Sequence, residues 1–100
     1  MTSRIEANGA RGADLLIDVR SAKGRAENGE AAGAVIVAKD QIAPLFGGAL
    51  GHLPKDSRIV VFCGSVAGSG PAVETLRGLG FTNAVDVEGG FGALKEAGLA

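Results

Sequence analysis

The chain has 100 residues, of which 46% are hydrophobic and 21% charged, and its formal net charge is −1. These values are typical of one globular domain, placed here at residues 1–100, and they give no reason to expect binding to nucleic acid or to an anionic membrane. No apolar run approaches the roughly 20 residues of a membrane span, and residues 1–9 hold no apolar signal segment. A cytoplasmic protein is therefore expected.

The chain has one cysteine, Cys63, and one histidine, His52. One cysteine cannot form an internal disulfide or a C-x-x-C redox pair. A structural zinc site would need ligands that this pair does not supply, and we expect neither a metal nor another cofactor. His52 falls near the end of an expected helix and is predicted to be a surface residue, not a catalytic one.

Short apolar runs alternate with helical patterns along the first half of the chain. A lead-in strand is predicted around residues 3–6, a strong strand at 15–19 and a short second core strand at 34–37. Residues 20–30 are polar and are predicted to form a loop with a weak helical turn. From Asp40, which is the expected cap, apolar residues at helical spacing predict a helix; they are Ile42, Leu45, Phe46, Ala49, Leu50 and Leu53.

The second half of the chain holds the strongest strand signal. After a turn at residues 53–57, four consecutive apolar residues predict a fully buried strand within 58–62. A helix is predicted at 70–79, with Pro71 in its first turn, where a missing N–H is tolerated. Gly80 is well placed to end that helix in a left-handed conformation.

Residues 81–87 predict another short strand, and residues 91–97 a last helix that packs onto the core through Phe91 and Leu94. Strands that alternate with helices imply crossover connections and a mostly parallel sheet of four to five strands with helices on both faces. Ligands bind at the carboxyl ends of the strands in such sheets. Cys63 lies at one such end.

The surroundings of Cys63 favour a chemical role. It directly follows the buried strand and precedes a run rich in Gly, Ser and Ala that leads into a helix. Loop amides and a helix N-terminus offer unsatisfied N–H groups, which favour the nucleophilic thiolate and suit the anionic sulfur of a persulfide. By residue type alone, such a cysteine is more often a small buried hydrophobe. The loop and the helix start favour a nucleophile, because a structural cysteine needs neither.

Five stretches, in the right order and over nearly the full length, resemble the rhodanese family of sulfurtransferases. The family's LIDVR strand is similar to residues 15–20, and its GHIPGA segment is similar to residues 28–34, with Glu30 in place of His. The approach to its active-site cysteine is similar to residues 53–56 and 59–63, and its GF.NV…L.GG ending is similar to residues 80–91.

This resemblance implies a three-layer rhodanese-like α/β fold and a reaction. Cys63 would attack a sulfane-sulfur donor, thiosulfate or a persulfide, hold the sulfur as a persulfide and pass it to a thiol, to cyanide or to an acceptor protein. Arg20 is a candidate substrate-binding residue, although Asp18 and Arg20 are expected to form a structural pair or a loop anchor and not to act as catalysts. The persulfide would be stabilised by the loop amides, which belong to Gly64, Ser65, Val66, Ala67, Gly68 and Ser69.

Two departures from the family's C-x-x-G-x-R-S loop affect the expected activity. Val66 stands where the Gly is expected and Gly68 where the Arg is expected. Without that Arg, a fixed positive charge that would clamp a dianion is missing, so we expect weak thiosulfate activity and favour a less charged or persulfide donor.

A catalytically weak rhodanese-like binding or sulfur-carrier module would explain the altered loop. A cysteine phosphatase is rejected, because its C-x5-R loop needs an arginine where Ser69 stands. The nearby charges are expected to be solvated loop residues; they are Lys23, Arg25, Glu27 and Glu30.

Overall fold

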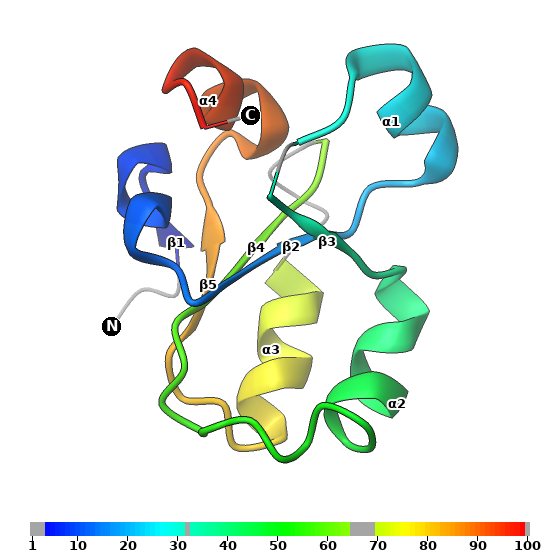
Figure 1. Cartoon of the computed structure of the whole chain (residues 1–100), viewed down its shortest axis with the longest axis vertical. Coiled ribbons are helices and arrows are strands. Elements are labelled where there is room, and N and C mark those ends of the chain that lie inside the picture. The colour runs from blue at the N-terminus through cyan, green and yellow to red at the C-terminus, as the bar shows by residue number, and fades with distance from the viewer. Residues whose placement is uncertain (1–3, 32, 65–69, 100) are drawn as a thin grey trace.

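The computed structural model describes residues 4–31, 33–64 and 70–99. These residues form a five-stranded sheet in the order β1-β5-β4-β2-β3, in which every pairing is parallel (Figure 1). This confirms the predicted α/β architecture. The strands are β1 (Arg4–Ile5), β2 (Leu15–Asp18), β3 (Val35–Ile36), β4 (Ile59–Phe62) and β5 (Ala84–Val87).

Helices cover both faces of the sheet (Figure 1). The helices α2 and α3 pack on one face, and η1 and α4 pack on the other, while α1 follows β2 beyond its carboxyl end and buries none of its residues. None of the described helices is long and apolar enough to cross a membrane. Their bounds are η1 (Ala7–Gly12), α1 (Ala22–Asn28), η2 (Lys39–Gln41), α2 (Ile42–Phe46), α3 (Gly70–Gly78) and α4 (Gly90–Glu96).

The central strand β4 is buried on both sides, as its unbroken apolar run predicted. Successive side chains of a strand point to opposite faces, so Ile59 and Val61 join the core under α2 and α3, whereas Val60 and Phe62 join the core under α4. Cys63 continues this alternation and belongs to the α2–α3 core.

The helices that flank β5 agree with the sequence. In α3, Pro71 occupies the first turn, and the chain turns at Gly80, whose φ is +99°. Phe91 and Leu94 of α4 are buried, as predicted. The strand β5 begins only at Ala84, because the residues before it form a turn.

Residues 20–30, for which a loop with a weak helical turn is predicted, contain the seven-residue helix α1. The hydroxyl of Ser21 accepts a hydrogen bond from the Gly24 amide at 3.0 Å and so caps the helix. The Lys23 Nζ atom lies 3.9 Å from Oε1 of Glu27, which is one helical turn further along. Since no residue of α1 is buried, the segment has no apolar stripe, and hydrophobic periodicity could not reveal it.

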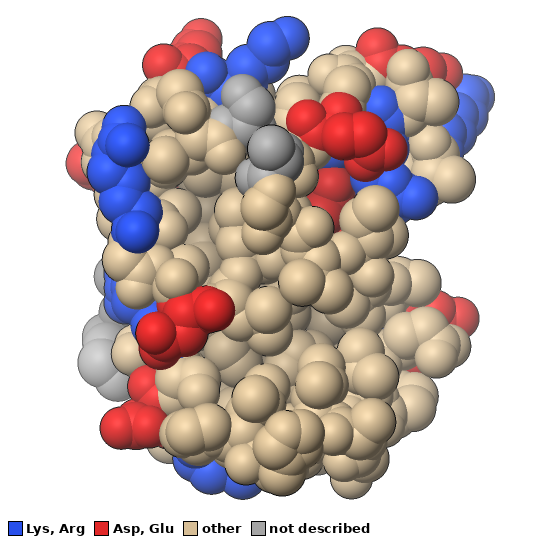
Figure 2. Space-filling model, viewed as in Figure 1, with Lys and Arg blue, Asp and Glu red and all other residues tan. Residues whose placement is uncertain are grey.

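The strand β3 forms at the predicted place but is not a core strand. It lies at the edge of the sheet, and its two side chains, Val35 and Ile36, are 44% and 53% exposed. An apolar run indicates a strand without saying whether the strand is central or at an edge. Figure 2 shows the face that includes β3: its centre is uncharged, whereas charged side chains of both signs gather over α1.

The helix predicted from Asp40 is shorter than expected and begins differently. Asp40 lies within η2, and the residue before α2 is Gln41, which makes no side-chain cap, so the predicted cap is wrong. The helix α2 ends at Phe46, directly before Gly47 and Gly48. Two consecutive glycines weaken a helix by about 1 kcal/mol each relative to alanine, and α2 ends where they begin.

Candidate active site

Cys63 lies at the carboxyl end of β4 and is 3% exposed. Its backbone carbonyl accepts a hydrogen bond from the Phe91 amide at 2.8 Å, which joins the end of β4 to the start of α4. On the other side, the amide of Val19 donates to the carbonyl of Phe62 at 3.0 Å. The ends of β2 and β4 therefore lie side by side, and the segment after β2 reaches the surroundings of Cys63.

An open pocket of about 540 Å³ lies at this edge of the sheet. Its walls come from the end of β4, from the β2–α1 connection with the adjoining face of α1, and from η2. Such a volume is typical of small-molecule sites. The lining residues that matter here are Arg20, Ser21, Asn28, Lys39, Asp40 and Cys63.

The loop that was predicted to surround the cysteine sulfur is described only in part. Gly64 lines the pocket beside Cys63. The other predicted loop residues, which are Ser65, Val66, Ala67, Gly68 and Ser69, lie outside the described residues. Their role in binding the substrate stays a prediction.

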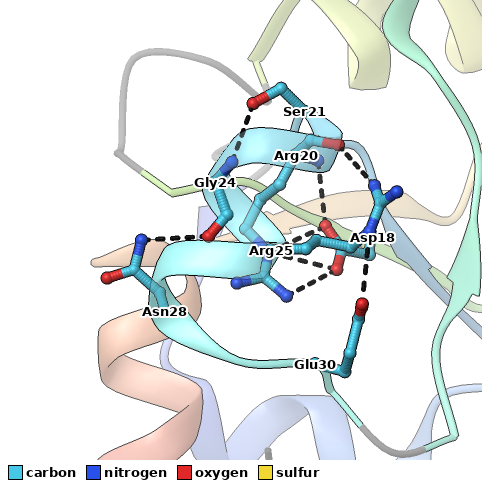
Figure 3. Close-up of polar contacts among 7 residues, drawn as sticks. All are labelled: Asp18, Arg20, Ser21, Gly24, Arg25, Asn28 and Glu30. Carbon is cyan, nitrogen blue, oxygen red and sulfur yellow. Dashed lines mark hydrogen bonds and ion pairs between the residues drawn. The ribbon is translucent and has the colours of Figure 1, made fainter.

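Asp18 and Arg20 form the structural pair predicted from the sequence. The Arg20 Nη2 atom lies 2.8 Å from Asp18 Oδ2, and its Nε atom lies 3.0 Å from Asp18 Oδ1. The Arg20 side chain is only 2% exposed and the Asp18 side chain only 1%. A bidentate, buried contact of this kind is among the stronger polar interactions in proteins. Figure 3 shows the pair beneath α1, at the end of β2.

Two aromatic rings complete the surroundings of the Arg20 guanidinium. Its central carbon lies 3.9 Å from the centre of the Phe91 ring and 5.7 Å from that of Phe62. The Nη1 atom is buried and has no hydrogen-bond partner among the described residues. Cation–π attraction to these rings stabilises the buried guanidinium. The positive charge of Arg20 is thus engaged by Asp18 and by aromatic faces. A direct role of Arg20 in substrate binding stays a prediction.

Arg25 is not the solvated loop charge that was expected. Its side chain is only 16% exposed, and its Nη1 atom donates a hydrogen bond to the backbone carbonyl of Arg20 at 2.8 Å (Figure 3). Its Nε atom lies 3.3 Å from Glu30 Oε1, an ion-pair distance without hydrogen-bond geometry. Arg25 therefore ties α1 to the segment that forms the pocket wall. By contrast, Lys23, Glu27 and Glu30 are exposed, as predicted.

Sequence reasoning missed two charged residues of the pocket, Lys39 and Asp40. Both are exposed, lie in η2 and line the pocket that contains Cys63. They follow the carboxyl end of β3, so the rule that parallel sheets bind ligands at this edge could have indicated them. His52 is exposed, as expected, with its Nδ1 atom 2.9 Å from the Ala49 carbonyl, and it does not line this pocket.

Comparison with known proteins assigns this arrangement to a family. The sequence matches the family described as "Rhodanese-like domain" over residues 2–97. The chain therefore belongs to the rhodanese-like family, as its motifs suggested. No curated protein sequence matches it.

Solved structures of other organisms share the fold. A rhodanese-related protein of Thermoplasma volcanium is 28% identical, with a TM-score of 0.72 over 100% of this chain and 96% of its own. The protein SSP1007 of Staphylococcus saprophyticus is 25% identical, with a TM-score of 0.72 over 100% and 99%. The human single-domain sulfurtransferase TSTD1 is 21% identical, with a TM-score of 0.73 over 96% and 97%.

Proposed function

We propose that the protein is a sulfurtransferase that moves sulfane sulfur from a donor to a thiol or cyanide acceptor through a persulfide on Cys63. The observation that carries this proposal is the position of Cys63, the chain's only cysteine, at the carboxyl end of the central strand and in the wall of an open pocket. Membership of the rhodanese-like family and the shared fold with the human sulfurtransferase TSTD1 support it.

The reaction has two displacement steps and needs no external oxidant. In the first, the Cys63 thiolate attacks the outer sulfur of the donor, a new S–S bond forms on Cys63, and the donor leaves as sulfite or as a thiolate. In the second, cyanide or an acceptor thiolate attacks that outer sulfur, and Cys63 leaves as a thiolate. On the sequence pattern, the amides of residues 64–69 are assigned to stabilising the anionic sulfur.

The charges around the pocket favour a persulfide donor over thiosulfate. The guanidinium of Arg20 is neutralised by Asp18 at 2.8 Å. The exposed cation in the described pocket wall is Lys39, and Asp40 stands next to it. A dianion finds no cluster of positive charge there, and Gly68 stands where active relatives carry an arginine.

Intact-mass measurement tests the persulfide directly. After incubation with a small persulfide donor, the wild-type protein should gain the mass of one sulfur atom, and cyanide should remove it. The variant Cys63→Ser should gain nothing. If the wild type gains no sulfur, or if Cys63→Ser gains as much, the proposed chemistry is wrong.

A second candidate is a catalytically weak binding or sulfur-carrier module on the same fold. The observation that favours it is the altered loop, with Val66 and Gly68 in place of the family's Gly and Arg. Turnover separates the two functions. An enzyme forms many equivalents of product per protein in the presence of donor and thiol, whereas a carrier loads once and releases its sulfur only to its own partner.

A further inference from the structure

The charged groups left available to a ligand in the described part of the pocket are one lysine and one aspartate. Arg20 also lines the pocket, but its charge is paired with Asp18. Lys39 and Asp40 are consecutive, exposed and without an ion pair among the described residues. The η2 wall therefore presents a positive and a negative group next to each other.

The described pocket wall formed by Ser21 and α1 presents no charged side chain to a ligand. The Ser21 hydroxyl accepts from the Gly24 amide at 3.0 Å, and the Asn28 Nδ2 atom donates to the Gly24 carbonyl at 3.0 Å (Figure 3). Both side chains are uncharged and already serve the backbone of α1. In the described part of the pocket, the charged residues of η2 therefore distinguish ligands by charge.

The size of the pocket also argues against a small inorganic ion as its only ligand. Its volume of about 540 Å³ lies within the range of sites that hold organic molecules, far more than the five atoms of thiosulfate require. A molecule that occupies this space can place its sulfur at Cys63 and still reach η2.

We propose that the pocket selects thiols and persulfides that carry an amino-acid head group, with the carboxylate at Lys39 and the ammonium group at Asp40. This inference rests on the sulfur transfer proposed above and names its substrate class. In the acceptor direction, the thiolate R–S⁻ attacks the outer sulfur of Cys63–S–SH, the S–S bond to Cys63 breaks, and R–S–SH and the Cys63 thiolate form. Atoms, charge and oxidation state balance in this step.

A matched series of thiols tests the selection. Cys63 is first loaded with inorganic polysulfide and then mixed with cysteine, 3-mercaptopropionate, cysteamine or 2-mercaptoethanol, which differ mainly in their charged groups. Single-turnover loss of the bound sulfur is followed by mass, and rates are compared per thiolate. Cysteine should be the fastest, and the singly charged thiols should fall between it and 2-mercaptoethanol.

Substitutions of Lys39 and Asp40 test which charged group of the ligand each residue binds. Lys39→Gln should lower the rate ratio of cysteine to 2-mercaptoethanol about 3-fold, the size of one exposed ion pair, and should lower the ratio for 3-mercaptopropionate as well. Asp40→Asn should do the same for cysteine and cysteamine. The controls Lys95→Gln and Glu96→Gln, exposed on α4 and outside the pocket, should leave every ratio unchanged.

Equal per-thiolate rates for all four thiols on a loaded wild-type protein would overturn the inference. So would a blocked cysteine, N-acetylcysteine amide, that reacts as fast as cysteine, since it represents a cysteine within an acceptor protein. Failure of Cys63 to load at all would instead overturn the transfer function itself, and the inference with it.

Discussion

The backbone amide of Phe91 donates a hydrogen bond to the carbonyl oxygen of Cys63 at 2.8 Å. The ring of the same residue lies over the Arg20 guanidinium, 3.9 Å from its central carbon. One residue in the first turn of α4 thus contacts the ends of both β4 and β2, which border the pocket. The geometry of the site therefore depends on how α4 packs on the sheet.

Shortening Phe91 should destabilise the protein. The ring stacks on Phe62 at 6.4 Å and is buried in the core under α4. We expect Phe91→Ala to lower the free energy of unfolding by about 3–5 kcal/mol, with Phe91→Leu clearly milder, as measured by urea unfolding. An unchanged midpoint for Phe91→Ala would show that α4 contributes little to the fold.

Removing the charge of Arg20 should lower the free energy of unfolding by as much as Phe91→Ala does. Arg20→Met leaves the carboxylate of Asp18 buried without its cation, and breaking such a pair costs about 3–5 kcal/mol. The double variant Asp18→Asn with Arg20→Met should recover part of the loss, because no unpaired charge remains. Lys23→Met, which removes an exposed pair at 3.9 Å, is the control and should change stability by less than about 0.5 kcal/mol. Equal losses for Arg20→Met and Lys23→Met would contradict the prediction.

Two glycines at the start of α4 should respond in opposite directions to alanine. Gly89 has a φ of +82°, and a Cβ atom there would lie 2.9 Å from the Cβ of Ala93. Gly92 lies within the helix with nothing near its Cβ position. Gly89→Ala should therefore destabilise the protein, whereas Gly92→Ala should stabilise it by about 0.5–1 kcal/mol. Thermal unfolding measures both effects. Melting temperatures that shift in the same direction for the two variants would contradict this account of the turn.

Restoring the family's arginine should change the choice of donor. Gly68 lies outside the described residues, so this prediction rests on the sequence pattern. A guanidinium that contacts an anion contributes about 1.5–3 kcal/mol, so Gly68→Arg should raise the rate with thiosulfate relative to that with a persulfide by about tenfold or more. Initial rates with the two donors give this ratio, and a ratio equal to that of the wild type would count against a missing anion clamp.

The strength of the sequence signal varied with how each segment is buried. The four residues of β4 are all buried, and their unbroken apolar run predicted both the central strand and the place of Cys63 after it. In α1 no residue is buried, so the helix has no apolar stripe, and only the Ser21 cap could have indicated it. Arg25 was misjudged for the same reason, because its contact with the Arg20 carbonyl depends on α1 being a helix.

The sequence by itself determined the alternation of strands and helices, the burial of β4 and the position of Cys63 between a strand and a helix. It could do so because those features depend on neighbouring residues and on the repeat of apolar side chains. Only the tertiary structure decided that β3 lies at an edge, that Arg20 packs against Phe91, and that Lys39 and Asp40 share a pocket with Cys63. These relationships join residues far apart in the chain, and the order of the strands in the sheet places them together.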